Sequence, residues 1–96
     1  MNSDDATTFH IAWIINDDQV ADTVQIVVYD PIEYRIPIFE VDTGLPVKSD
    51  PGTVADRARE LLQIDGGFIV HTIEPDGSGF AAVVESSRAG TVRSDF

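Results

Sequence analysis

Apolar residues recur at intervals of three or four along residues 53–64, TVADRARELLQI, and polar residues fill most of the positions between them. This spacing places the apolar side chains on one side of a 3.6-residue period and predicts an amphipathic helix. The apolar positions of the helix are Val54, Ala55, Ala58, Leu61 and Leu62. One face of the predicted helix is therefore suited to packing against a core.

Both ends of this helix carry residues that commonly begin and end helices. Asp50 can cap the first turn with Pro51 inside it, or Thr53 can serve as the cap. Gly66 and Gly67 follow the helix and can supply the left-handed conformation with which many helices end.

Five other stretches are rich in aromatic and β-branched residues, a composition that predicts β-strands. They are residues 9–15 (FHIAWII), 23–29, 32–41, 68–74 and 80–85. The Asp30-Pro31 pair and segment 75–79, PDGSG, predict tight turns between neighbouring strands. Segment 42–51 is predicted to be a turn-rich connector. Pro37 lacks a backbone donor, so its strand is expected at a sheet edge or with a bulge.

These elements predict an α+β fold, a mainly antiparallel five-stranded sheet with one helix on one face. The expected order is strand, strand, strand, helix, strand, strand, and a strongly curled, barrel-like sheet is the main variant. Ninety-six residues make one domain. We place it at residues 8–85, between a flexible N-terminal end (1–7) and a C-terminal tail or docking arm (86–96).

Most of the predicted strands carry apolar residues on both faces. Neighbouring residues of a strand point to opposite faces, so Trp13 and Ile14 diverge, as do Val27 and Val28. One helix covers one face, and leaving several such side chains in water forfeits several kcal/mol at ~25 cal/mol per Å². We therefore expect the second face to be covered by barrel closure, by the tails or by another protein chain. The candidate interface residues are Trp13, Val27, Tyr29, Phe39, Arg57, Arg59 and Phe96.

The chain is strongly acidic, with 17 Asp and Glu, six Lys and Arg, and a net charge of −11. Direct nucleic-acid binding is disfavoured because phosphate contacts need clustered Lys and Arg. The acidity can reflect a solvated surface, adaptation to high salt or mimicry of a phosphate backbone. Aspartate outnumbers glutamate and Lys48 is the only lysine, a composition that resembles proteins of extreme halophiles.

The two histidines, His10 and His71, fall in the middle of predicted strands. Alternation places His71 on the same face as Ile69 and Ile73. Neither histidine has a second ligand at metal-binding spacing or a local partner for general-base chemistry. We therefore interpret both as core or interface residues.

The densest carboxylates, Asp4-Asp5 and Asp17-Asp18, lack the alternating pattern of a calcium-binding loop. Segment 76–79, DGSG, lacks the sequence of a nucleophile elbow. The chain has no cysteine, which excludes disulfides and thiolate metal sites. We expect no catalytic residue, no cofactor and no metal.

We therefore expect a non-catalytic acidic interaction or structural subunit that self-associates or joins a larger assembly, such as a virus particle or another multi-copy complex. The alternative is an acidic inhibitor that mimics nucleic acid, and the third hypothesis is a small ligand-binding barrel or enzyme. The sequence shows no signal peptide and no apolar run of ~20 residues. We therefore expect a cytoplasmic or virion-associated protein that is neither secreted nor bound to a membrane.

Overall fold

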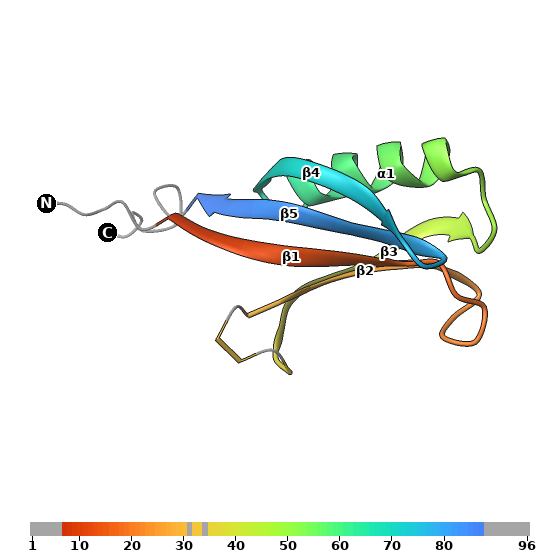
Figure 1. Ribbon diagram of the computed structural model, residues 1–96, viewed down its shortest axis with the longest axis horizontal. Coiled ribbons are helices and arrows are strands. Elements are labelled where there is room, and N and C mark those ends of the chain that lie inside the picture. The colour runs from red at the N-terminus through yellow and green to blue at the C-terminus, as the bar shows by residue number, and fades with distance from the viewer. Residues whose placement is uncertain (1–6, 31, 34, 88–96) are drawn as a thin grey trace, which may run out of the picture.

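The computed structural model describes residues 7–30, 32–33 and 35–87, which form a five-stranded antiparallel sheet with one helix on one face (Figure 1). The helix, α1, spans Pro51–Ile64. The strands are β1 (Thr7–Ile15), β2 (Thr23–Tyr29), β3 (Pro37–Pro46), β4 (Phe68–Asp76) and β5 (Gly79–Ser87). This confirms the predicted α+β fold and the predicted order of its elements. Apart from the ends of β1 and β5, the predicted N-terminal end and C-terminal tail lie outside the described residues.

The sheet is open. Its strand order is β3-β2-β1-β5-β4, so β3 and β4 form opposite edges that do not pair with each other. The helix α1 contacts both β3 and β4 and lies over the face between them. The barrel-like variant is therefore wrong, because the helix covers this face of the sheet and the two edge strands stay apart.

The central strand β1 pairs with β2 on one side and with β5 on the other. Its side chains alternate as the sequence predicts: Ala12 and Ile14 are buried under the helix, whereas Ile11 and Trp13 are exposed on the opposite face. Val24, Ile26 and Val28 of β2 share the helix-covered face, so the predicted alternation holds in both strands.

The helix begins at the predicted cap. The Asp50 carboxylate accepts a hydrogen bond from the Thr53 amide at 3.2 Å, and Pro51 is the first helical residue. At the other end the amides of Asp65 and Gly66 both donate to the Leu61 carbonyl, at 3.0 and 3.1 Å. The predicted apolar stripe packs on the sheet, although Ala55 is only half-buried.

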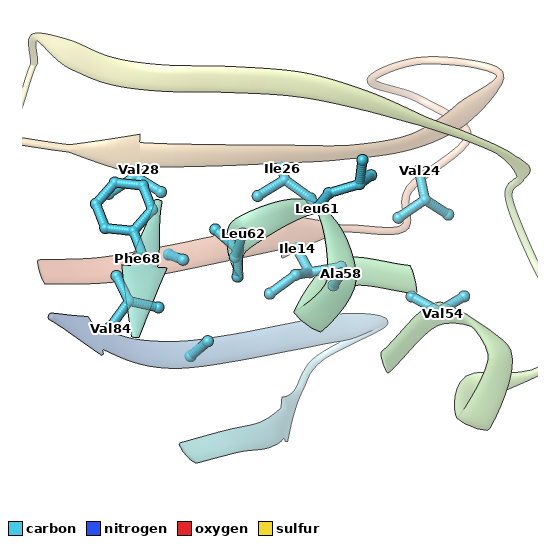
Figure 2. Close-up of a cluster of buried hydrophobic side chains, with 12 residues drawn as sticks. Ile14, Val24, Ile26, Val28, Val54, Ala58, Leu61, Leu62, Phe68 and Val84 are labelled. Carbon is cyan, nitrogen blue, oxygen red and sulfur yellow. The ribbon is translucent and has the colours of Figure 1, made fainter. Parts of the chain in front are cut away.

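A single apolar core lies between α1 and the sheet (Figure 2). Four helix residues and eight strand residues contribute to it. The buried set is Ala12, Ile14, Val24, Ile26, Val28, Val54, Ala58, Leu61, Leu62, Phe68, Ala82 and Val84. The whole core therefore lies on one side of the sheet.

Strand β3 starts and ends later than the sequence predicts. Residues 32–36 were predicted as strand because apolar and polar residues alternate there, but Ile32 and Ile36 lie exposed in the β2–β3 loop. The Asp30 carboxylate accepts hydrogen bonds from the amides of Ile32 and Glu33 at 2.8 and 2.9 Å, which holds a turn instead. These bonds also lower the pKa of Asp30 from its ordinary value of 3.8.

Segment 42–46 was predicted to be part of a connector but continues β3 to Pro46. Its Gly44 and Pro46 suggested a turn, yet an edge strand tolerates both because one side of its backbone is unpaired. Pro37 opens the same edge strand, which confirms the prediction for that proline.

Strand β4 contains an irregularity that reverses part of the predicted alternation. The register with β5 shifts between Val70 and Thr72, so one extra residue is inserted. As a result Ile69 is exposed on the uncovered face, whereas Ile73 packs against the core. The prediction that Ile69, His71 and Ile73 share one face is therefore wrong.

Candidate interaction surface

The sheet face opposite α1, here called the open face, is largely apolar. Residues that pair across antiparallel strands share a face, so the pairing partners of the exposed β1 residues belong to it. Together with alternation along each strand, this pairing defines its apolar members. They are Phe9, Ile11, Trp13, Ile15, Val27, Tyr29, Ile69, Ala81 and Val83.

Three large side chains of the central strand form the middle of this face. Phe9, Ile11 and Trp13, here called the β1 stripe, are 55%, 43% and 39% exposed. Trp13 is flanked by Val27 on β2 and Ala81 on β5. An apolar patch that is continuous across three strands is unusual on an isolated soluble domain and is typical of a binding surface.

Carboxylates line both margins of the open face. Glu40 and Asp42 come from β3 and pair with open-face residues of β2. Glu74 of β4 pairs with an open-face residue of β5, and Glu85 of β5 pairs with β1. None of the five strands contains a lysine or an arginine. The strands therefore contribute carboxylates to this face and no lysine or arginine.

Asp42 is fixed in its ionised form at the β3 margin. The Gly44 amide donates to one carboxylate oxygen at 2.8 Å, and the Thr23 hydroxyl donates to the other at 2.9 Å. The Gly44 amide first, and then the side chains of Thr23 and Gln25, hold the pKa of Asp42 below its ordinary value of 3.8. Asp42 is therefore a carboxylate at neutral pH, and it links β3 to β2.

His71 and Glu85 form a polar pair at one end of the β1 stripe. The His71 Nε2 atom lies 2.7 Å from Glu85 Oε1, and the His71 ring lies 5.3 Å from the Phe9 ring. A carboxylate that orients a histidine is a common arrangement for proton transfer. Here the pair stands on a sheet face, at the opposite end of β5 from the two hollows described next.

Two surface hollows lie at the turn end of the sheet. The larger has a volume of about 310 Å³ and is lined by Asn16, Asp17, Asp18, Val47, Lys48 and Ser78. Lys48 lies 3.8 Å from the Asp18 carboxylate, and its amide donates to Asn16 at 2.9 Å. Asp17 accepts from the Gln19 amide at 2.9 Å. Local hydrogen bonds and one ion pair therefore engage these loop groups. Across the described residues, no cluster of three or more potential ligands for a metal ion occurs.

His10 is a core residue. It is 7% exposed, and its ring meets Phe68 edge-on at a centroid distance of 5.8 Å. Both ring nitrogens are buried without a hydrogen-bond partner among the described residues. The His10 ring therefore packs against Phe68 on the covered side of the sheet.

Of the predicted interface residues, the structure brings three together on the open face and places three others away from it. Trp13, Val27 and Tyr29 lie on the open face, but Phe39 lies on the helix-covered side, with its ring 5.7 Å from that of Phe68. Arg57 and Arg59 lie on α1. Phe96 lies outside the described residues.

Arg57 donates to Glu60 at 3.0 Å and to the Thr43 carbonyl at 3.3 Å. It therefore connects the helix to β3, on the side of the sheet away from the open face. The prediction omitted Phe9 and Ile11, although the large apolar residues at every odd position of 9–15 already placed them beside Trp13.

Comparison of the chain with protein-family models, with curated proteins and with solved structures finds no match. Within the described part of the chain, no helix combines the length and the hydropathy needed to cross a bilayer.

Proposed function

We propose that this protein is a non-catalytic binding subunit that buries its open face against another protein chain, as part of a larger assembly or by joining copies of itself. The observation that carries this proposal is the β1 stripe, because its three large apolar side chains lie exposed on the central strand of the sheet. The central strand of a sheet is ordinarily its best covered part.

Covering this stripe would release a large free energy. Aromatic side chains each bury roughly 150–250 Å² when they are fully enclosed. The exposed parts of Phe9, Ile11 and Trp13 therefore correspond to several kcal/mol at ~25 cal/mol per Å². That gain is a substantial fraction of the roughly 5–15 kcal/mol that stabilises an ordinary domain.

The arrangement of the face also supports a protein partner. Binding energy at interfaces concentrates in central aromatic residues, and a polar rim surrounds them. Trp13 lies near the middle of the open face, and the carboxylates of Glu40 and Glu74 lie at its margins.

The other two hypotheses receive less support. A mimic of nucleic acid would present its carboxylates on one side, whereas the described acids lie on α1, as Asp56 and Glu60 do, as well as on the open face. A ligand-binding barrel needs a closed sheet, and this sheet is open.

Sedimentation velocity and acrylamide quenching of Trp13 test the proposal. In an assembly that uses the open face, Trp13 becomes shielded, and Ile11→Thr weakens association about tenfold or more, which corresponds to about 1.4 kcal/mol. Ile64→Thr is the matched control, because Ile64 is 73% exposed at the end of α1. Association that depends on neither Ile11 nor Trp13 would contradict the proposal.

A further inference from the structure

We propose that the partner of the open face is a cationic amphipathic segment, a polypeptide whose apolar side chains are flanked by lysines or arginines. This inference rests on the proposed function and names the chemistry of the chain that covers the same face. The order of charges and apolar groups across the sheet carries it.

The first step is the sign of the margins. Glu40 and Asp42 stand on the β3 side and Glu74 on the β4 side, and the open-face residues of β2, β1 and β5 between them are mainly apolar. Glu85 of β5 adds a further carboxylate within this zone, beside Phe9. The lysines and arginines of the described residues all lie outside the strands, at Arg35, Lys48, Arg57 and Arg59. The carboxylates at the margins therefore attract cations, because their own strands carry no lysine or arginine that would neutralise them.

The second step is the width of the apolar zone. Neighbouring strands lie about 4.8 Å apart, so the backbones of β2 and β5 are separated by roughly 10 Å. An α-helix with its side chains is about 10–12 Å across. A helix laid along β1 would therefore contact the β1 stripe and carry side chains on its two flanks toward the carboxylates of β3 and β4.

The third step is the length of the stripe. From Phe9 to Trp13 the strand rises roughly 14 Å at about 3.4 Å per residue. A helix covers that distance in about nine residues, or two to three turns. The flexible stems of lysine and arginine lie along apolar surface while their charged ends reach outward. A short segment with three apolar residues on one face and cations beside them would match this surface.

A second copy of this chain is a poorer match. It would bring the same carboxylates to the same margins, on a molecule whose net charge is −11. Like charges that face each other across an interface oppose association unless salt screens them. The charge pattern therefore favours a basic partner over a face-to-face dimer at low ionic strength.

The test is a titration of the protein with four designed helical peptides, followed by the fluorescence of its single tryptophan, Trp13. Three peptides share one leucine face and carry lysine (Lys/Leu), serine (Ser/Leu) or glutamate (Glu/Leu) on the other face. The fourth peptide (Lys/Ser) carries lysine and serine and contains no leucine. We expect the Lys/Leu peptide to bind about tenfold more tightly than the Ser/Leu peptide and to shift Trp13 emission to the blue. The ratio of the two affinities should decrease as salt is added, because salt screens the attraction between the lysines and the carboxylates.

Charge-matched variants locate the effect. Glu40→Gln combined with Glu74→Gln should lower the affinity for the Lys/Leu peptide about fivefold or more. Asp56→Asn combined with Asp65→Asn removes the same charge from α1 and its C-cap, on the covered side of the sheet, and should change that affinity about twofold at most. Ile11→Thr should lower the affinity for the Lys/Leu peptide and for the Ser/Leu peptide by a similar factor.

The outcomes separate this inference from the proposed function. Equal affinity for the Ser/Leu and Lys/Leu peptides would overturn the inference of a cationic partner but not the proposal that the open face binds a protein. A dimer that shields Trp13 and excludes the peptides would have the same consequence. Equal affinity for the Lys/Ser and Lys/Leu peptides overturns the inference, because charge alone would then suffice. A monomer that binds none of the peptides contradicts both proposals.

Discussion

Gly79 lies so close to the backbone of β1 that the chain has no space for a side chain there. A Cβ atom at this position would clash with the Ile14 carbonyl oxygen and lie 3.2 Å from the Asn16 amide nitrogen. Gly77, in the same turn, differs: a Cβ would meet no atom within 4 Å, but its φ of +62° lies in the left-handed region. The two glycines are therefore required for different reasons.

Substituting these glycines separates a steric requirement from a conformational one. We expect Gly79→Ala to lower the free energy of unfolding by about 2–3 kcal/mol, because β1 and β5 must move apart. Gly77→Ala should lower it by about 1 kcal/mol, and Gly77→Asn by less, because asparagine tolerates the left-handed region. Urea unfolding measures all three. A Gly79→Ala loss no larger than that of Gly77→Ala would contradict the close approach of the strands.

The sequence reveals single-residue roles only where they follow from a local pattern. The alternation of residues 9–15 predicted that neighbouring side chains of β1 point to opposite faces of the sheet, and the structure confirms this for Trp13 and Ile14. The requirement for Gly79 depends on a carbonyl of β1, far away in the chain, so a turn sequence could not reveal it. The same holds for His10, whose buried ring meets Phe68 of another strand.

At the scale of elements, prediction succeeded where the signal is local. The helix was found from its own periodicity and its Asp50 cap, and β2 was predicted with its observed bounds. Strand β3 was misplaced because the Asp30 carboxylate holds residues 32–33 in a turn, and because an edge strand accommodates Gly44 and Pro46. No pattern in the sequence of β4 predicted its bulge.

The link between β2 and β3 through Asp42 should make stability depend on pH in acid. The pKa of Asp42 is lower in the folded protein, so its ionised form stabilises the fold above pH 3.8, and this stabilisation is lost as the pH falls through the lowered pKa. Asp42→Asn should therefore be less stable than the natural chain at neutral pH, with the difference vanishing in acid. Urea unfolding at several pH values measures this.

Asp56→Asn is the control for this experiment, because Asp56 is an exposed carboxylate on α1. It should change stability little at any pH. A constant gap between Asp42→Asn and the natural chain from neutral to acid pH would show that the Thr23 and Gly44 hydrogen bonds do not depend on the charge.

At the scale of the whole molecule, the sequence predicted one helix and a sheet with two apolar faces. The structure shows the helix and an apolar surface on each face of the sheet. The sequence could not predict that β3 and β4 remain separate edges, because closure depends on how the helix packs against both of them. The acidic margins of the open face also needed the cross-strand register that places Glu40 beside Val27. Composition alone gave the number of carboxylates and left their arrangement open.

The net charge of −11 should make thermal stability rise with salt. Between about 0.1 M and about 1 M salt the Debye length falls from ~10 Å to ~3 Å, which screens repulsion between surface carboxylates. We expect Tm to increase by several degrees over this range of NaCl, measured by circular dichroism. A variant carrying Asp56→Asn and Asp65→Asn should show a smaller increase. A Tm that stays constant or falls would show that repulsion contributes little.

The pairing of Thr7 with Ser87 has a practical consequence for labelling this molecule. These residues lie side by side at one pole of the sheet, and the β1–β2 and β4–β5 turns occupy the other. A donor and an acceptor fluorophore attached at these paired backbone positions would therefore be brought together in the native state and would separate when β1 and β5 come apart. Such a donor–acceptor pair would follow the separation of strands β1 and β5 from their terminal end, without altering Trp13 on the open face.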